Sequence, residues 1–335
     1  MKTTNVALLG LGNVGRAFAR YVHRTGPESA LDLVIGAAAD RSGGLLLRNN
    51  SLVERLMAHK ESGRVLREFA PDQLIAGSAE FIRLLPSAGV SVLIESLPTN
   101  IDSGEPGLGL ITAALEQGTN VVSVDKGPLV HGFEALKEAE RKGKSRFAYS
   151  GATGVSIPQE AIGERVLEIR GVLNGTTNYV LTEMQQHERS FEGALSTAQA
   201  EGIAEPDPSL DIQGWDTAAK ILILAKSLMG AEARLSDVSR KGIGPETESL
   251  IRIARESGRV VRLVGRARIW QGRVRVSVAP KLIGADSPFY SVAGTSKAAI
   301  FRTERHGEIH ASARSGRDAI AQTIMDDISK IMSEL

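Results

Sequence analysis

The stretch 201-EGIAEPDPSLDIQGWDTAAK-220 concentrates acidic side chains in front of a single lysine. Its two prolines keep the first half out of a helix. The second half continues into the apolar run 221-ILILA-225, and the pattern predicts a helix over 213–229. The stretch therefore predicts a loop rich in carboxylates that leads into a buried helix. Its charged residues are Glu201, Glu205, Asp207, Asp211, Asp216 and Lys220.

Asp216 and Lys220 form the pair in this stretch that could do chemistry. They are four residues apart, so on a helix they are neighbours. On a solvated helix face such a pair would stabilise the helix by about a few tenths of a kcal/mol. The apolar surroundings indicate instead that the pair is buried. Burying two charges costs folding free energy, so a buried pair at this place suggests a functional role. A lysine whose pKa is lowered by desolvation can transfer a proton, and carboxylates at Glu205 and Asp211 suit a substrate with an ammonium or hydroxyl group.

A second segment with chemical meaning is the glycine-rich turn 10-GLGNVG-15. It follows the apolar run 5-NVALLG-10, which is typical of a buried parallel strand, and it precedes a helical pattern. In this context Gly10 allows a tight turn, Gly12 lets backbone approach a pyrophosphate, and Gly15 lets helix and strand pack closely. A tight turn without a ligand is the alternative, and the context favours a dinucleotide site.

The end of the next strand, 31-LDLVIGAAAD-40, bears on which dinucleotide would bind. Asp40 could accept hydrogen bonds from the ribose 2′-hydroxyl of NAD, whereas Arg41 could meet the 2′-phosphate of NADP. Arg41 could equally be a solvent-exposed loop residue. Because the two residues are adjacent, the sequence leaves the preference between NAD and NADP open.

The first half of the chain alternates strands with helices. Strand-like runs at 90–95, 119–126 and 145–150 are separated by helical segments at about 107–117 and 132–142. This alternation predicts an α/β fold with a Rossmann-type doubly wound parallel sheet.

The second half has a different pattern. Helices are expected near 178–188, 190–201 and 213–229, and strand-like alternation between about 257 and 310 predicts an open mixed sheet. The segment 317–332 is amphipathic and helical. The second half therefore predicts an α+β domain, and its last helix needs a partner for its apolar face.

The composition excludes several classes of function. Of the 335 residues, 42% are hydrophobic and 24% are charged, an ordinary globular balance for two domains. The net charge of +1 gives no sign of a nucleic acid or an anionic membrane as partner. Cysteine is absent, which excludes disulfides, thiolate zinc sites and cysteine nucleophiles. No apolar run is long enough to span a membrane and no signal peptide is evident, so a cytoplasmic protein is expected.

Three segments together resemble the homoserine dehydrogenase family. The stretch ending on Lys220 resembles its pattern G-x-x-E-x-D-P-x-x-D-x-x-G-x-D-x-x-x-K. The segment 171-GVLNGTTNYVL-181 resembles its N-G-T-T-N segment, and 119-TNVVSVDKGPL-129 is similar to its V-V-T-A-N-K strand end. The resemblance covers essentially the whole chain. It implies NAD(P)-dependent interconversion of L-homoserine and L-aspartate 4-semialdehyde, in the supply of threonine, methionine and isoleucine.

The resemblance also implies roles for individual residues. Lys220 would pass the proton at the reacting oxygen, Lys126 would assist beside the nicotinamide, and Asp216 would orient the lysines. Glu205 and Asp211 would hold the amino-acid end of the substrate. The pocket floor would consist of Asn174, Gly175 and Thr176. The dinucleotide would be bound by Gly10, Gly12, Asn13, Val14, Gly15, Asp40, Arg41, Ser96, Ser123 and Lys126.

Relatives of this kind suggest a domain plan and a homodimer. A nucleotide-binding domain is expected at 1–130 plus 315–335, and a substrate-binding and dimerisation domain at 131–314. The last helix is expected to return to the nucleotide domain and cover the cofactor cleft. No ACT-type regulatory or kinase domain is expected, and therefore no feedback inhibition by threonine through such a domain.

Three segments depart from the family pattern, and one of them is 312-SARSG-316, where the family has G-P-G-A-G. Where the family has T-A-N-K, the chain has 123-SVDK-126, so the Asp125 carboxylate stands beside the lysine and could hold its pKa up. Where the family has a glutamate that helps to bind a monovalent cation, the chain has Ser150. Carbonyl groups at Thr153 and Val155 would be left as cation ligands.

Two other hypotheses stay open. Another NAD(P)-dependent dehydrogenase, of a related hydroxy amino acid or of a sugar, would use the same nucleotide fold, although sugar dehydrogenases usually carry E-K-P where this chain has 95-ESLP-98. A catalytically silent nucleotide-binding paralogue would account for the departures at Asp125 and Ser150. The intact lysines and carboxylates argue against it.

Overall fold

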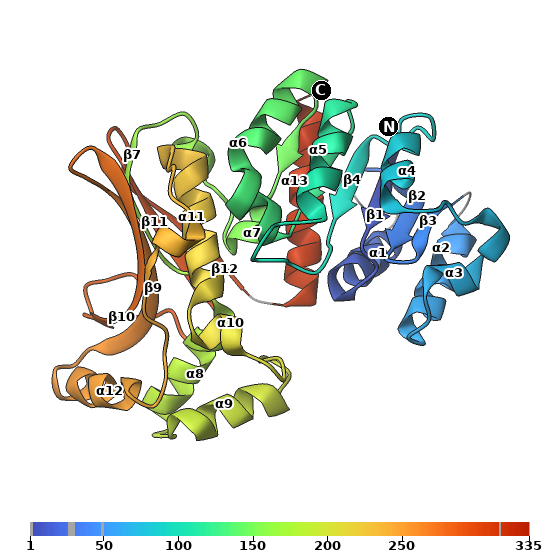
Figure 1. Cartoon of the computed structure of the whole chain (residues 1–335). Helices are drawn as coiled ribbons and strands as arrows, with labels where there is room; N and C mark the ends of the chain where they lie inside the picture. The colour runs from blue at the N-terminus through green and yellow to red at the C-terminus, as the bar shows by residue number, and fades with distance from the viewer. Residues whose placement is uncertain (1–2, 26–30, 48–49, 315, 335) are drawn as a thin grey trace. The chain divides into compact units, whose positions relative to one another are not determined.

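The computed structural model divides into two compact units, Met1–Ala152 with Gly316–Leu335 and Thr153–Ser315. Each unit is built on a six-stranded sheet (Figure 1). No helix in the part of the chain that the structure describes is long and apolar enough to cross a bilayer. The described residues are 3–25, 31–47, 50–314 and 316–334.

The sheet of the first unit has the strand order β3-β2-β1-β4-β5-β6. All neighbouring strands are parallel except β2 and β3. The winding reverses between β1 and β4, and open α/β sheets bind ligands at such a switch point. The predicted doubly wound sheet is thus confirmed. The strands are β1 (Thr4–Leu9), β2 (Leu33–Asp40), β3 (Gly43–Leu46), β4 (Val92–Glu95), β5 (Asn120–Ser123) and β6 (Phe147–Ala148).

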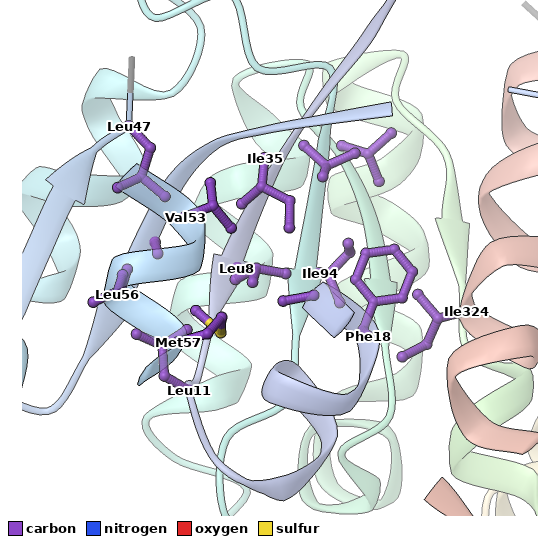
Figure 2. Packing of buried hydrophobic residues seen from close by; sticks show 14 of the residues in the cluster. Leu8, Leu11, Phe18, Ile35, Leu47, Val53, Leu56, Met57, Ile94 and Ile324 are labelled. Carbon is purple, nitrogen blue, oxygen red and sulfur yellow. The ribbon is translucent and has the colours of Figure 1, made fainter. Parts of the chain in front are cut away.

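Helices pack on this sheet through an apolar core. Figure 2 shows Leu8 of β1, Phe18 of α1, Ile94 of β4 and Ile324 of α13 in one buried cluster. The last helix therefore buries its apolar face within the first unit, beside α1. The helices are α1 (Asn13–Thr25), α2 (Asn50–Glu61), α3 (Leu66–Phe69), α4 (Ser78–Leu84), α5 (Gly107–Glu116), α6 (Lys126–Gly143), α7 (Ser150–Thr153) and α13 (Arg317–Ser333).

The first unit extends further than the boundary that we expected at residue 130. That boundary falls inside α6, which spans Lys126–Gly143 with a kink at Gly132. The strand after it, β6, pairs with β5 through Val121 and Phe147. Residues 131–152 belong to the first unit because they form part of α6 and the strand β6. The boundary between the two units therefore lies after Ala152.

The sheet of the second unit has the order β12-β11-β7-β9-β10-β8 and is antiparallel except for the pair β10 and β8. It confirms the predicted open mixed sheet. The inner strand β7 occupies a segment that we did not predict to be a strand. The strands are β7 (Val166–Val172), β8 (Ser239–Arg240), β9 (Val260–Trp270), β10 (Arg273–Ile283), β11 (Lys297–Thr303) and β12 (Gly307–Ala313).

Helix α11 lies along one face of this second sheet (Figure 1). The approach is close, because a Cβ atom added at Gly265 of β9 would stand 3.1 Å from the Ile221 Cβ. This packing accounts for the apolar run after Lys220. The helices of the unit are α8 (Gly175–Gln186), α9 (Phe191–Ala200), α10 (Ser209–Ile212), α11 (Trp215–Met229) and α12 (Thr247–Glu256).

Candidate active site

Asn174 joins the end of β7 to two carboxylates of the acidic stretch. It is 5% exposed, and its Nδ2 donates to Asp211 Oδ1 at 2.6 Å and to Asp216 Oδ2 at 2.8 Å. Its Oδ1 accepts from the Thr177 backbone N–H at 2.8 Å and so caps helix α8. Asn174 has the extended backbone of an N-cap residue and reaches the third amide of the helix.

Lys220 is held by two acceptors. Its Nζ donates to Asp216 Oδ2 at 2.5 Å and to the Leu173 carbonyl at 3.0 Å. The two charged side chains are only 13% and 11% exposed, so the pair is not a solvated surface pair. An ammonium has three N–H donors. Among the described residues two of them have acceptors, which leaves one for a ligand.

The two neighbouring carboxylates share one lysine. Burial and the charge of Asp216 raise the pKa of Asp211, and the smaller effects of Lys220, Thr176 and Asn174 lower it. With both acids ionised, the group of Asp211, Asp216 and Lys220 carries a net negative charge. A ligand with an ammonium group would neutralise it, as expected for an amino-acid substrate.

The other predicted substrate residues differ in their distance from this group, since some bond to it and one lies at the surface. Gly175 is the first residue of α8, and the Thr176 side chain hydrogen-bonds to Asp211. Glu205 is exposed, on the segment between α9 and α10. The structure therefore joins five predicted residues in one hydrogen-bonded group and leaves the Glu205 carboxylate at the surface. The five are Asn174, Thr176, Asp211, Asp216 and Lys220.

The glycine-rich turn in the first unit is tight at two positions and open at one. Gly10 has a φ of +106°, and a Cβ there would stand 2.5 Å from the Ser96 carbonyl oxygen. At Gly15 a Cβ would stand 2.1 Å from the Gly10 oxygen, whereas at Gly12 nothing lies within 4 Å. Helix α1 begins directly after Gly12 and has no acidic residue in its first turn. Open space beside the positive end of a helix fits a pyrophosphate.

The remaining predicted residues of this turn support its shape. Ser96 donates its hydroxyl to the Gly10 carbonyl at 3.1 Å. Asn13 starts the helix and accepts from Arg16 at 3.1 Å, and Val14 packs against the core.

The Asp40 carboxylate accepts more hydrogen bonds from within the protein than we expected from the sequence. Its carboxylate is 9% exposed and accepts from the Ser42 amide, the Ser42 hydroxyl, Lys60 and the Leu66 amide at 2.6–2.9 Å. Burial raises its pKa, but these donors lower it further, so the net shift is downward. A carboxylate offers about four acceptor positions. As arranged, Asp40 has none left for a ribose hydroxyl, whereas Arg41 is exposed.

Ser123 is buried and bonded inside the first unit. Its hydroxyl donates to Glu95 Oε2 at 2.6 Å and accepts from the Asp125 amide at 3.1 Å. Glu95 is 0% exposed, and burial together with the charge of Asp125 raises its pKa to about 8. Glu95 was not among the site residues that we predicted. The available signal was an acid at the end of the apolar run 90-VSVLIE-95.

Asp125 has partners in addition to Lys126, which we expected beside it. Its carboxylate accepts from the Gly127 amide at 3.0 Å as the N-cap of α6, and it bonds to the Thr99 side chain. Burial raises its pKa, and attraction to Lys126 is a smaller opposing effect. Lys126 is the first residue of α6, at the end of the sheet where β5 stops.

The segment after α6 contains the residues of the predicted cation site. The Val155 carbonyl accepts the Thr153 hydroxyl at 2.6 Å, which uses one of its two lone pairs. The Ser150 hydroxyl donates to Asp327 at 2.7 Å and has no charge to offer a cation. No group of three or more metal-binding side chains occurs within the described ranges. A monovalent cation held by the carbonyls of Thr153 and Val155 stays a prediction, without the charged ligand that Ser150 replaces.

Comparison with known proteins gives consistent results. Residues 156–329 match the family model described as homoserine dehydrogenase. The chain is 31% identical to the homoserine dehydrogenase of Methanocaldococcus jannaschii, over 98% of both chains. It is 32% identical to the NAD(+)-dependent homoserine dehydrogenase of Pseudomonas canavaninivorans, over 99% of this chain and 97% of that one. A solved structure described as a putative homoserine dehydrogenase from Archaeoglobus fulgidus superimposes with a TM-score of 0.83 at 28% identity, over 98% of this chain and 99% of the other.

Proposed function

The chain belongs to the homoserine dehydrogenase family, and we propose that it interconverts L-homoserine and L-aspartate 4-semialdehyde with NAD or NADP. The observation that carries this proposal is the largely buried Lys220, which Asp216 and the Leu173 carbonyl hold while one of its N–H groups has no acceptor among the described residues. The direct test supplies L-homoserine with either dinucleotide at mildly alkaline pH and follows the nicotinamide absorbance. Turnover would support the proposal, and its absence despite cofactor binding would contradict it.

Lys220 is the group that moves the proton. When bound, the nicotinamide accepts or returns the hydride at the carbon that carries the oxygen. In the direction of reduction, the Lys220 ammonium donates a proton to the aldehyde oxygen, and in the direction of oxidation the same nitrogen takes the proton back. Asp216 keeps the ammonium in place through the 2.5 Å bond. Lys126, at the edge of the nucleotide sheet, assists beside the nicotinamide.

The amino-acid end of the substrate is held by charge. Asp211 and Asp216 share one lysine, so a substrate ammonium supplies the second positive charge. Asn174 fixes the two carboxylates at a set separation by donating to both. Glu205, which is exposed, would engage the ammonium from the surface loop.

Cofactor binding at the glycine-rich turn can be separated from folding by two alanine variants. We expect Gly12→Ala to fold like the parent and to raise the Kd for the dinucleotide about tenfold, because the added methyl fills only the space that the pyrophosphate needs. We expect Gly15→Ala to lower stability by about 1–3 kcal/mol, because its Cβ would stand 2.1 Å from a backbone oxygen. Dinucleotide titration and thermal melts measure the two effects. Equal losses of stability in both variants would contradict this assignment.

The 2′-phosphate of NADP is received by Arg41. Asp40 has its acceptor positions filled by Ser42, Lys60 and Leu66, and this arrangement favours NADP over NAD. We expect Arg41→Ala to raise KM for NADP about tenfold, the loss expected for a charge-assisted hydrogen bond, and to leave KM for NAD unchanged. Steady-state kinetics with both dinucleotides measure this. Arg83→Ala, on an exposed arginine of α4, is the matched control. An equal effect of Arg41→Ala on both cofactors would contradict the assignment.

We further propose that the protein works as a cytoplasmic homodimer on this small-molecule substrate. Exposed apolar side chains at the end of β9, Ile269 and Trp270, support a role of the second unit in subunit contact. The mass in solution, measured by light scattering, tests the dimer. A monomer at micromolar concentration would contradict it.

A further inference from the structure

Glu95 is a buried carboxyl group at the end of β4 that the proposed chemistry does not use. It is 0% exposed and stands opposite Ser123 in the register of β4 and β5. One carboxyl oxygen accepts from Ser123 Oγ at 2.6 Å and the other from the Leu97 amide at 2.8 Å. On its other side Glu95 pairs with Leu9 of β1, which is apolar. Among the described residues, the charged group that acts on Glu95 is Asp125.

A chain of hydrogen bonds leads from Glu95 to the start of α6. Ser123 Oγ accepts from the Asp125 amide at 3.1 Å, and Asp125 Oδ1 accepts from the Gly127 amide at 3.0 Å. The Asp125 carboxylate fits tightly, because a Cβ added at Gly107 would stand 3.1 Å from its other oxygen. Lys126 lies between the two residues of this cap. Its backbone is therefore fixed by the same contacts.

We propose that Glu95, acting as a neutral carboxylic acid, is a positioning residue for Lys126, which it holds at the start of α6 through Ser123 and the Asp125 cap. This inference rests on the proposed function, in which Lys126 assists at the nicotinamide. Glu95 itself touches neither substrate nor cofactor in this account.

The electrostatics of the group support a neutral Glu95. Burial and the charge of Asp125 raise its pKa to about 8, and its bonds to Ser123 and Leu97 oppose the shift only in part. Below that pH, Asp125 and Lys126 are a balanced pair of charges. Above it, a second buried anion faces Asp125, and the repulsion between the two carboxylates weakens the cap that fixes Lys126.

The folded state should therefore lose stability as Glu95 ionises. Its folded pKa lies above the usual value of 4.5, so the folded chain binds this proton more tightly than the unfolded chain does. The stability that the neutral acid contributes is present at low pH and is lost as the pH rises through the window from about 4.5 to 8. A glutamine at this position cannot ionise, so the Glu95→Gln variant lacks this part of the pH dependence of stability.

The test compares Glu95→Gln and Glu95→Ala with the parent. Glu95→Gln keeps the shape and the neutral state, so kcat at neutral pH should stay near that of the parent, and the loss of activity above pH 8 should move to higher pH. Its melting temperature should fall less than that of the parent between mildly acidic and alkaline pH. Glu95→Ala should lower kcat about tenfold to a hundredfold with little change in the KM for homoserine, since Lys126 is then misplaced.

Amide hydrogen exchange at Gly127 gives a readout that needs no turnover. It should become faster in Glu95→Ala and stay unchanged in Glu95→Gln. Glu140→Gln, at an acid near the other end of α6, is the control and should leave the exchange at Gly127 and the alkaline activity limit unchanged. If the parent does not oxidise homoserine, the proposed function fails, and the exchange result still decides the role of Glu95.

Two results would overturn the inference. One is normal kcat and normal Gly127 exchange in Glu95→Ala, which would show that Lys126 does not depend on Glu95. The other is loss of turnover at neutral pH in a folded Glu95→Gln variant, which would show that the carboxyl group acts in its ionised or proton-transferring form.

Discussion

Lys220→Ala is expected to lower kcat by about two to four orders of magnitude and to leave dinucleotide binding close to that of the parent, because it removes the group that transfers the proton. The lysine lies in the second unit and bonds to Asp216 and the Leu173 carbonyl, whereas the glycine-rich turn belongs to the first unit. Its loss also leaves Asp211 and Asp216 without their shared cation. Substrate KM is therefore expected to change along with kcat.

The measurement combines steady-state kinetics with dinucleotide titration. Lys226→Ala, two turns further along the same helix, removes an equal charge from α11 and is the matched control. Its kinetics should equal those of the parent. A kcat of Lys220→Ala within tenfold of the parent value would contradict the role assigned to this lysine. Loss of dinucleotide binding would show that the variant acts through folding instead.

Asn174→Asp is expected to reduce kcat/KM for homoserine at neutral pH by about a hundredfold, which corresponds to roughly 2.7 kcal/mol. The change keeps the size of the side chain and its ability to cap α8, since aspartate is as good an N-cap as asparagine. It replaces the Nδ2 donor by an oxygen that faces Asp211 Oδ1 at 2.6 Å and Asp216 Oδ2 at 2.8 Å. Three carboxyl groups would then meet at one point with a single lysine.

The pH dependence of this variant provides a second measurement. Lowering the pH protonates one of the crowded carboxyl groups and restores a hydrogen between the oxygens, so part of the lost activity should return below neutrality. Ser190→Asp makes the matched change at the N-cap of α9, where the side chain accepts from the Gly193 amide. That control should keep normal kinetics. A uniform loss of activity at every pH would contradict the charge argument.

Local patterns of the sequence were sufficient for the framework of the site. The glycine-rich turn follows from a strand, three glycines and a helix within one short segment, and its open position at Gly12 agrees with the role assigned to it. The Asp216–Lys220 bond follows from helical spacing, because residues four apart on a helix are neighbours whatever the rest of the fold does. The doubly wound sheet follows from the alternation of strands and helices.

Other features depend on residues that are distant along the chain. Asn174 meets Asp211 and Asp216 only because β7 ends where α11 begins, and β7 itself carries no strand pattern that we recognised. The boundary between the units after Ala152 depends on the pairing of β6 with β5. This pairing joins strands that are distant along the chain, so local sequence patterns do not predict it.

The sequence by itself determined which elements form and which of their residues are neighbours within one element, because periodicity and turn chemistry act over a few residues. Only the tertiary structure decided how each charge is used. It engaged Asp40 with Lys60, left Glu205 at the surface and buried Glu95 against Ser123. The protonation state and the free hydrogen bonds of a side chain depend on desolvation and on partners brought from elsewhere in the chain, and these exist only once the chain is folded.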